Sequence, residues 1–359
     1  MKKIFALFLA TFALYACDID DGKDQVPPTI VTEGVYILNN GNYASNDAAL
    51  SLYDAQTKTL ATNVFQSANN KKLGDLAQDM LIYGDKMYIA VYNSKVIFVT
   101  NRKGEIIEEL RVSNGDSNLS PRALIGYDGK VYATMYEGYL AQIDTLNYTT
   151  SLVKVGDNPE GLVAVDDRVF VANSGGMNYP VYGNTVSVVT VKDIMQEVTT
   201  IQVVENPTRM VSNIRGEIFL ISMGNYGDVP NTLQRIDPRS LDVKVVTDKP
   251  VTYMSMGSDS RLYFISAQYD ENWNMDISVG VYNTLSGTME ADFIVDQTKI
   301  ANTPTCISVD PVTQEVYIGT SDYVSEGDMY HFSKDGKLVN KFGTGGLNPI
   351  GAYFLMGIK

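Results

Sequence analysis

The sequence has few of the residues on which enzyme and metal sites depend. Its 359 residues include one histidine, two cysteines and one tryptophan. A single histidine excludes a multi-histidine metal site and leaves no Ser-His-Asp or Cys-His set beyond His331. His331 stands between Tyr330 and Phe332 in a strand-like segment, where a packed side chain is the simpler interpretation. We therefore expect no enzymatic activity, no catalytic residue, no metal and no cofactor.

Positive charge is also scarce. Lys and Arg total 28 against 42 Asp and Glu, which gives a formal net charge of −14. An acidic chain is repelled by nucleic acid and by anionic lipid surfaces, so we expect neither as a binding partner. Cys306 stands alone in an apolar segment, and we expect it to be a buried small hydrophobic residue.

The N-terminal residues do not follow the pattern of the rest. Lys2 and Lys3 precede an apolar run over residues 4–13 that has the length of a signal peptide and is too short to span a membrane. The next four residues, Leu14-Tyr15-Ala16-Cys17, resemble a bacterial lipobox, which predicts cleavage before Cys17 and a lipid on that cysteine. An ordinary cleavage site beside an incidental cysteine is the alternative.

The residues after Cys17 are acidic, with Asp18, Asp20 and Asp21 in close succession. They resemble the surface-export signal of Bacteroidota lipoproteins, and a solvated linker is the alternative. Pro27 and Pro28 follow in the same segment. We predict a signal peptide over residues 1–16, a lipidated and flexible tether over 17–31, and a folded domain over 32–359.

The remainder of the chain repeats one pattern about every 40 residues. A short polar or Pro-containing segment leads into an apolar run, a tight turn, a strand of the Val-Tyr type, a loop, and a strand that ends near Asp. Seven second-strand patterns recur, at residues 34–38, 86–90, 130–134, 168–172, 217–221, 261–265 and 315–319. Short strands repeated at this period indicate a β-propeller or a solenoid, because one four-stranded unit cannot bury both of its faces alone.

Two features favour a closed ring over an open solenoid. The first copy begins directly with a second-strand pattern at Val35 and lacks a first strand. The chain ends with an unmatched first-strand pattern over residues 348–355. Pairing this C-terminal strand into the first blade closes the ring and removes an exposed sheet edge. We predict an all-β, seven-bladed β-propeller with about 28 strands and almost no helix.

The loops between second and third strands indicate which face binds a ligand. They are short in the second and third copies and long in the last four, at residues 173–184, 223–231, 268–276 and 321–327. Long loops gathered on one face usually mark a binding face, and these are rich in Tyr, Trp and Asn, which combine rigid apolar area with hydrogen bonding. The alternative is that the 23 tyrosines pack between blades, which we prefer for Tyr88, Tyr132, Tyr263 and Tyr317.

The first strands add polar residues near the axis, which could hold a ligand by fixed hydrogen bonds. The alternative is that Arg122 and Arg209 only neutralise Glu160 and Asp79. The candidate ligand-binding residues from loops and first strands together are Gln78, Asp79, Tyr92, Arg122, Tyr136, Glu160, Asn173, Tyr182, Arg209, Asn225, Tyr226, Tyr253, Tyr269 and Trp273.

The sequence resembles the YncE-like seven-bladed propeller lipoproteins of Bacteroidota. Three segments carry this resemblance, at residues 34–42, 73–80 and 158–161. That family includes the surface vitamin B12-binding lipoproteins of the BtuG type, and the resemblance covers essentially the whole mature chain. It implies a lipid-anchored protein of the outer membrane, facing the exterior. It further implies capture of cobalamin or a related corrinoid, as a transported ligand, and transfer to a TonB-dependent outer-membrane transporter. A glycan- or peptide-binding propeller in a surface uptake or adhesion complex is the alternative.

Overall fold

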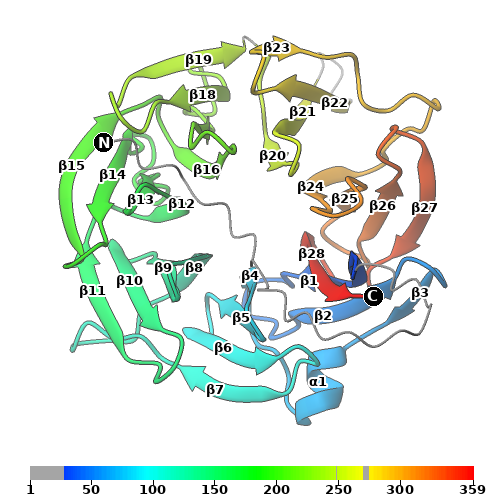
Figure 1. Ribbon diagram of the computed structural model, residues 1–359, viewed down its shortest axis with the longest axis horizontal. Coiled ribbons are helices and arrows are strands. Elements are labelled where there is room, and N and C mark those ends of the chain that lie inside the picture. Colours follow the sequence, from blue (N-terminus) through cyan, green and yellow to red (C-terminus); the bar gives the residue numbers. More distant parts are fainter. Residues whose placement is uncertain (1–27, 248, 270–274) are drawn as a thin grey trace, which may run out of the picture.

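The computed structural model describes residues 28–247, 249–269 and 275–359, and these form a ring of β-sheets around a central axis (Figure 1). The described residues contain 28 strands in seven antiparallel sheets of four strands each. One short helix among them, α1 (Val64–Asn69), follows the first blade. The predicted seven-bladed propeller is therefore confirmed, as is its low helix content.

The strands of each blade are given from the axis outward. Blade one contains β28 (Pro349–Ile358), β1 (Ile30–Asn39), β2 (Ala49–Asp54) and β3 (Thr59–Ala61). Blades two to four contain β4 (Ala77–Tyr83), β5 (Lys86–Val91), β6 (Val96–Asn101) and β7 (Ile106–Leu110); β8 (Pro121–Tyr127), β9 (Lys130–Met135), β10 (Tyr139–Asp144) and β11 (Thr150–Lys154); and β12 (Pro159–Val165), β13 (Arg168–Asn173), β14 (Thr185–Thr190) and β15 (Gln196–Gln202).

Blades five to seven follow the same order. They contain β16 (Pro207–Ser212), β17 (Ile218–Ser222), β18 (Thr232–Ile236) and β19 (Val243–Thr247); β20 (Tyr253–Met256), β21 (Arg261–Tyr269), β22 (Met275–Asn283) and β23 (Thr288–Met289); and β24 (Thr303–Val309), β25 (Val316–Ser321), β26 (Asp328–Phe332) and β27 (Leu338–Gly343).

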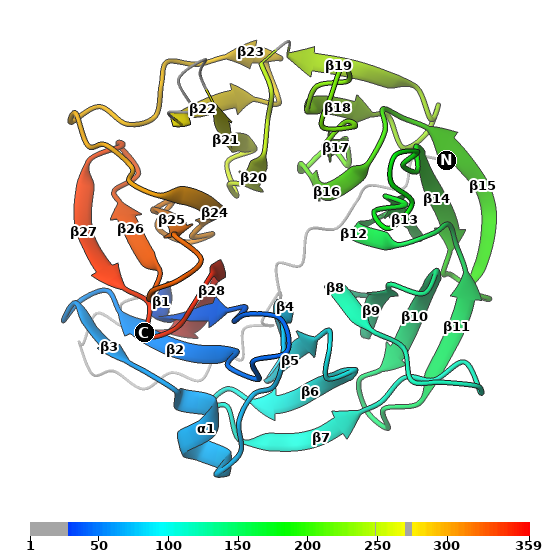
Figure 2. The ribbon, with the colours of Figure 1, turned by 180° about the vertical axis from the view of Figure 1, so that it is seen from behind.

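The C-terminal strand closes the ring as predicted. β28 pairs antiparallel with β1, with Val35 opposite Phe354 and Ile37 opposite Ala352 (Figure 2). Backbone hydrogen bonds between Thr29 and Lys359, at 2.8 and 2.9 Å, extend this pairing beyond both strands. The first blade thus takes its innermost strand from the far end of the chain, which leaves no open edge between the first and last blades.

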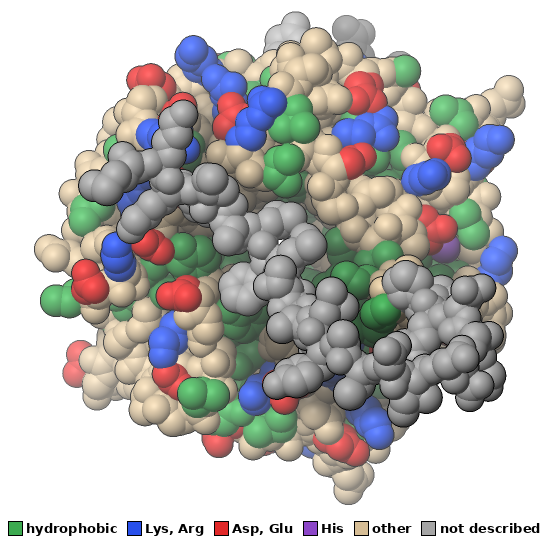
Figure 3. All heavy atoms as spheres, in the orientation of Figure 1, with side chains coloured by type: hydrophobic (Ala, Val, Ile, Leu, Met, Phe, Trp, Pro, Cys, Tyr) green, Lys and Arg blue, Asp and Glu red, His purple; other side chains and the backbone are tan. Residues whose placement is uncertain are grey.

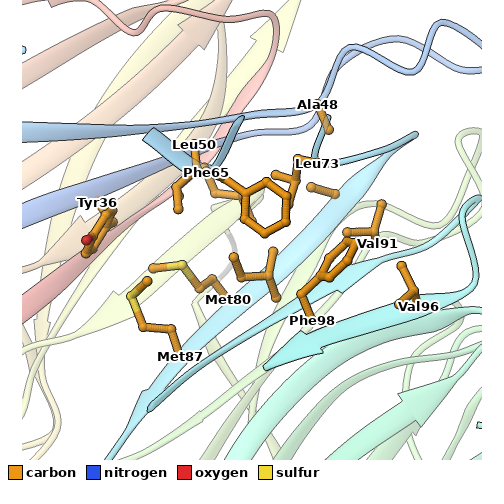
Figure 4. Close-up of a cluster of buried hydrophobic side chains, with 13 residues drawn as sticks. Tyr36, Ala48, Leu50, Phe65, Leu73, Met80, Met87, Val91, Val96 and Phe98 are labelled. Atoms are coloured by element: carbon orange, nitrogen blue, oxygen red, sulfur yellow. The ribbon is translucent and has the colours of Figure 1, made fainter. Parts of the chain in front are cut away.

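The Val-Tyr pattern of the second strands supplies the core between blades. The seven aromatic residues at its equivalent positions are at most 2% exposed, and they are Tyr36, Tyr88, Tyr132, Phe170, Phe219, Tyr263 and Tyr317. Between blades one and two, Tyr36 packs with Met80 and Met87, and α1 adds Phe65, whose ring centroid lies 4.9 Å from that of Phe98 (Figure 4). The four tyrosines that we assigned to packing are therefore core residues.

Strand direction gives the ring two distinct faces. The loops that join second to third strands, and the connections from one blade to the next, lie on one face, which we call the loop face. The hairpin turns between first and second strands lie on the opposite face, which we call the turn face. Gly84 has a φ of +65° in one of these turns, a conformation that glycine adopts without strain. Because β1 begins at Ile30 and β28 ends at Ile358 on the turn face, both ends of the domain lie opposite the loop face.

Charges of both signs are mixed on the visible part of one face of the ring (Figure 3). On the face drawn in Figure 3, the described Lys and Arg side chains are interspersed with Asp and Glu around the rim. None of the described helices has the length and apolar character needed to cross a bilayer.

The single histidine of the sequence and Cys306 are both packed. His331 lies in β26, is 1% exposed, stacks on Tyr317 at 4.3 Å and places Nε2 3.0 Å from Oε2 of Glu315. Cys306 is a free thiol that is 3% exposed, and burial raises its pKa to about 11. Both predictions of a packed role are confirmed.

Candidate functional site

The innermost strands direct polar side chains toward the axis because their pairing is irregular. Register shifts interrupt the pairing of six of these strands, including β24 and β28. The other four shifts lie between Ala77 and Asp79 in β4, Pro121 and Leu124 in β8, Pro159 and Leu162 in β12, and Pro207 and Arg209 in β16, and each is at or next to a charged residue. A bulge breaks the strict alternation of a strand and changes where its side chains point. These four shifts occur where the sequence places its charged first-strand residues, so these residues face the axis without leaving the sheet.

These residues line an axial cavity of about 400 Å³. The structure brings together all six candidates that the first strands supplied, namely Gln78, Asp79, Arg122, Glu160, Arg209 and Tyr253. Tyr353 of β28 joins them, and apolar side chains such as Leu162, Met210 and Met254 fill the spaces between. The cavity therefore has a mixed lining, in which polar groups at fixed positions alternate with apolar side chains.

Arg122 and Glu160 form a closed ion pair. Nε and Nη2 of Arg122 each donate to one carboxylate oxygen of Glu160 at 2.8 Å. The guanidinium also lies over the rings of Tyr92 and Tyr136, 5.5 and 5.1 Å from their centroids. Burial acts to lower the pKa of Arg122, but Glu160 and the two tyrosines raise it overall. The mutual neutralisation that the sequence left open is realised for this pair.

Asp79 is engaged by uncharged donors. Its carboxylate accepts hydrogen bonds from the backbone N–H groups of Leu124 and Met80, both at 2.8 Å, and from the hydroxyl of Tyr353 at 2.9 Å. Because blade walls surround it, burial raises the pKa of Asp79 to about 6, although these hydrogen bonds and the charge of Arg209 oppose the shift. Burial and the neighbouring carboxylate also raise the pKa of Tyr353.

Arg209 differs from Arg122 because it has no carboxylate partner. Its side chain is exposed at the cavity, and its guanidinium carbon lies 4.7 Å from the ring centroid of Tyr253. This side chain forms no hydrogen bond or ion pair with any residue that the structure describes. The alternative in which Arg209 neutralises Asp79 is therefore not found, and among the described residues of the cavity Arg209 is a cation without a carboxylate partner.

Tyrosines lie on the loop face, and six of the seven blades contribute at least one described tyrosine from the second-to-third loop or from the strand end beside it. We call them the loop tyrosines: Tyr43, Tyr92, Tyr136, Tyr179, Tyr182, Tyr226 and Tyr323. Several contact each other edge to face, with centroid distances of 5.4 Å for Tyr92–Tyr136 and 5.8 Å for Tyr182–Tyr226. Tyr43 and Tyr226 are 72% and 69% exposed, which leaves much of each ring free to contact another molecule.

The sequence analysis missed part of this set. Tyr43, Tyr179 and Tyr323 were not among the candidates, although the first and last of them occupy the same loop as the chosen tyrosines of other blades. Comparison of the loops of blades one and seven with the others would have identified them. Tyr353 could not be found in this way, because its place at the cavity depends on ring closure by β28.

Two candidate asparagines belong to the fold rather than to the exposed face. Asn173 is 2% exposed, and its amide donates to Ser187 at 2.9 Å and accepts from the N–H of Gly156 at 3.1 Å. It ends β13 inside the sheet, so its side chain does not reach the loop face. Asn225 accepts from the backbone N–H groups of Gly227 and Val229 and thereby shapes its own loop.

The loop of blade six is shorter than predicted. β21 and β22 extend the pairing as far as Gln268 opposite Asp276 and Tyr269 opposite Met275. Trp273 and the side chain of Tyr269 lie outside the described residues. In the part of the chain that is described, His, Cys, Asp and Glu side chains form no cluster of three that could hold a metal ion.

The fold and the site together define a seven-bladed propeller with an axial cavity bordered by tyrosine-bearing loops. A family model described as "Domain of unknown function (DUF5074)" matches residues 33–343, and the chain belongs to this family. No curated protein matches the sequence. The finer resemblance to vitamin B12-binding lipoproteins stays a prediction.

Solved structures share the fold at low identity. A proposed 6-phosphogluconolactonase from Bacteroides fragilis is 10% identical, with 90% of this chain and 98% of that chain covered and a TM-score of 0.63. One from Bacteroides uniformis is 12% identical, with 90% and 100% covered and a TM-score of 0.61. Dihydro-heme d1 dehydrogenase NirN in complex with DHE is 11% identical, with 90% and 75% covered and a TM-score of 0.57. At these identities the likeness shows the propeller fold alone.

Proposed function

We propose that the protein binds a corrinoid, such as cobalamin, on its loop face. The observation that carries this proposal is the set of loop tyrosines, which come from six of the seven blades and lie on the loop face, two of them against Arg122 of the axial cavity. A tyrosine offers a rigid apolar ring with a hydroxyl at its edge. Tyrosines spread over the loop face suit an extended ligand that has an apolar face and many amide groups at its periphery, and a corrinoid has both.

The dimensions of the cavity fit this mode of binding. At about 400 Å³ the cavity is near the lower end of the range for small-molecule pockets, which begins at roughly 300 Å³. A corrin macrocycle with its amide side chains is too large to enter it whole. We infer that the macrocycle lies against the loop tyrosines and that one substituent extends toward Arg122, Glu160 and Arg209.

The polar groups of the axial cavity fit ligand binding better than they fit catalysis. The one histidine of the sequence is packed in β26, away from the cavity, and Glu160 is neutralised by Arg122. The lactonase names belong to proteins that are 10 and 12% identical to this chain, so they suggest a reaction only weakly.

The partners that we propose follow from the N-terminal motif and from the resemblance to surface propellers. A lipid on Cys17 would anchor the protein in the outer membrane, and a TonB-dependent transporter would receive the corrinoid. The domain begins on the turn face, at the start of β1, so a tether would attach opposite the loop tyrosines. This arrangement supports a loop face that stays free to capture a ligand and to meet a transporter.

Calorimetric titration of the purified protein with cyanocobalamin tests the proposal. We expect saturable binding, weakened by Tyr226→Ala and unchanged by Ile214→Ala, because Ile214 is a similarly exposed apolar residue (75%) on the turn face. The absence of heat at two temperatures, with a folded sample, would reject the corrinoid. Saturable binding of oligosaccharides or peptides in that case would favour the alternative of a glycan- or peptide-binding propeller.

A further inference from the structure

We propose that Arg209 recognises an anionic group of the ligand, a phosphate or carboxylate that enters the axial cavity. This inference rests on the proposed function, since it assumes that the loop face is the binding face. It adds the chemistry of one substituent, which the loop tyrosines alone do not specify.

The first argument is that three arginines of the sheets have carboxylate partners, whereas Arg209, which lies at the cavity, has none within the described chain. Arg122 pairs with Glu160, and Arg235 of β18 pairs with Glu217 at 2.8 Å. Arg261 at the start of β21 pairs with Glu290 in the same way. The side chain of Arg209 forms no hydrogen bond or ion pair within the described chain, although the sequence has many more acidic than basic residues. An unpaired cation in a cavity of an acidic protein needs a reason other than charge balance.

The second argument is that the two carboxylates at the cavity already accept hydrogen bonds from other groups. Both oxygens of Glu160 accept from Arg122. Asp79 accepts from two backbone N–H groups and from the hydroxyl of Tyr353. Neither carboxylate can turn toward Arg209 without giving up hydrogen bonds that burial makes expensive to lose. The N–H donors of Arg209 are therefore available to an acceptor from outside the protein.

The third argument is that the guanidinium of Arg209 is held in place by contacts that leave its N–H donors available. The register shift between Pro207 and Arg209 in β16 directs the residue to the cavity, and the ring of Tyr253 supports its guanidinium at 4.7 Å. Stacking uses the face of the guanidinium and leaves its in-plane N–H groups free. A positioned guanidinium with free donors binds phosphate and carboxylate groups through two parallel hydrogen bonds.

A corrinoid offers a direct way to test this chemistry. Cobalamin carries a phosphodiester in its nucleotide loop, whereas cobinamide lacks the nucleotide and its phosphate. We expect Arg209→Gln to weaken cyanocobalamin binding about 10- to 100-fold, the effect of losing a hydrogen bond to a charged group, and to leave cobinamide binding unchanged. Arg168→Gln is the matched control, because Arg168 also lies over an aromatic ring, that of Phe170 at 5.4 Å, but at the start of β13 on the turn face.

The variant Arg209→Met serves as a second test, because its apolar side chain can still pack on Tyr253 if the glutamine variant folds poorly. Equal losses for both corrinoids, or no loss for either, would overturn the assignment while leaving corrinoid binding in place.

A separate measurement does not depend on corrinoids. It compares the melting temperature of each protein in inorganic phosphate with that in chloride at equal ionic strength. Phosphate should stabilise the wild type and Arg168→Gln but not Arg209→Gln. If no corrinoid binds and phosphate affects all three proteins alike, both proposals fail. If only Arg209→Gln loses the phosphate effect, the anion site stands without the corrinoid.

Discussion

Replacing Asp79 by asparagine should remove a specific pH dependence from the folding stability of this protein. Asp79 is enclosed by the blades and receives three hydrogen bonds from uncharged donors. Burial raises its pKa from 3.8 to about 6, because the cavity wall solvates the carboxylate less well than water does. An asparagine at this position can still accept from the N–H of Leu124 through its oxygen and donate to the hydroxyl of Tyr353.

The sign and size of the effect follow from proton linkage. Between pH 3.8 and about 6 the folded protein holds a proton on Asp79 that the unfolded chain has already lost. The contribution of Asp79 to the free energy of unfolding is therefore complete below pH 3.8 and is lost as the pH rises to about 6. A difference of this size between the two pKa values corresponds to roughly 3 kcal/mol.

Urea denaturation of the wild type and of Asp79→Asn, at intervals from pH 4 to pH 7.5, measures this contribution. Other carboxylates titrate in both proteins and cancel in the difference. The stability of the wild type relative to the variant should fall by about 3 kcal/mol as the pH rises, with most of the change below pH 6. A difference that stays constant across this range would refute the argument that Asp79 is desolvated at the cavity.

Three further predictions concern the loop face, the core and ring closure. Tyr226→Ala should weaken corrinoid binding about tenfold in a calorimetric titration without changing the melting temperature, because the side chain is 69% exposed. Tyr317→Phe should stabilise the protein by about 1 kcal/mol in urea denaturation, since its buried hydroxyl has no partner, whereas Tyr132→Phe should not, since its hydroxyl accepts from Gln142. Ending the chain before β28 should abolish cooperative unfolding, measured by circular dichroism, because blade one loses its innermost strand.

The predictions that succeeded rest on local chemistry. The seven second strands show their aromatic residue and their alternation in short windows, and each is bounded by turn residues that fix a hairpin. The closure of the ring could also be predicted. The first blade lacks a first strand before Val35 and the chain has an extra one after Asn348, so pairing the extra strand into the first blade completes all seven sheets. The packed roles of His331 and Cys306 followed from strand-like segments that leave few alternatives.

Two candidate residues show how much depends on where a side chain points at the end of a strand. Asn173 and Asn225 both occur at the beginning of long loops, but one turns into the sheet and the other bonds to its own backbone. The sequence could not distinguish these outcomes from exposure, because amides form such local hydrogen bonds as readily as they bind a ligand. In blade six the described ends of the expected long loop, residues 268–269 and 275–276, continue the pairing of β21 and β22.

The sequence by itself determined the all-β class, the number of blades, the closure of the ring and the face on which a site is to be sought. These properties depend on the repeat of the strand pattern and on the alternation of residues along each strand, and both can be recognised in short segments of the sequence. Only the tertiary structure decided which polar groups neutralise one another at the axis. Arg122 meets Glu160, Asp79 meets Tyr353 from 274 residues away, and Arg209 meets no carboxylate in the described chain. The physical reason is that a register shift of one or two residues in an inner strand sets where each charge lies, and pairing depends on that position.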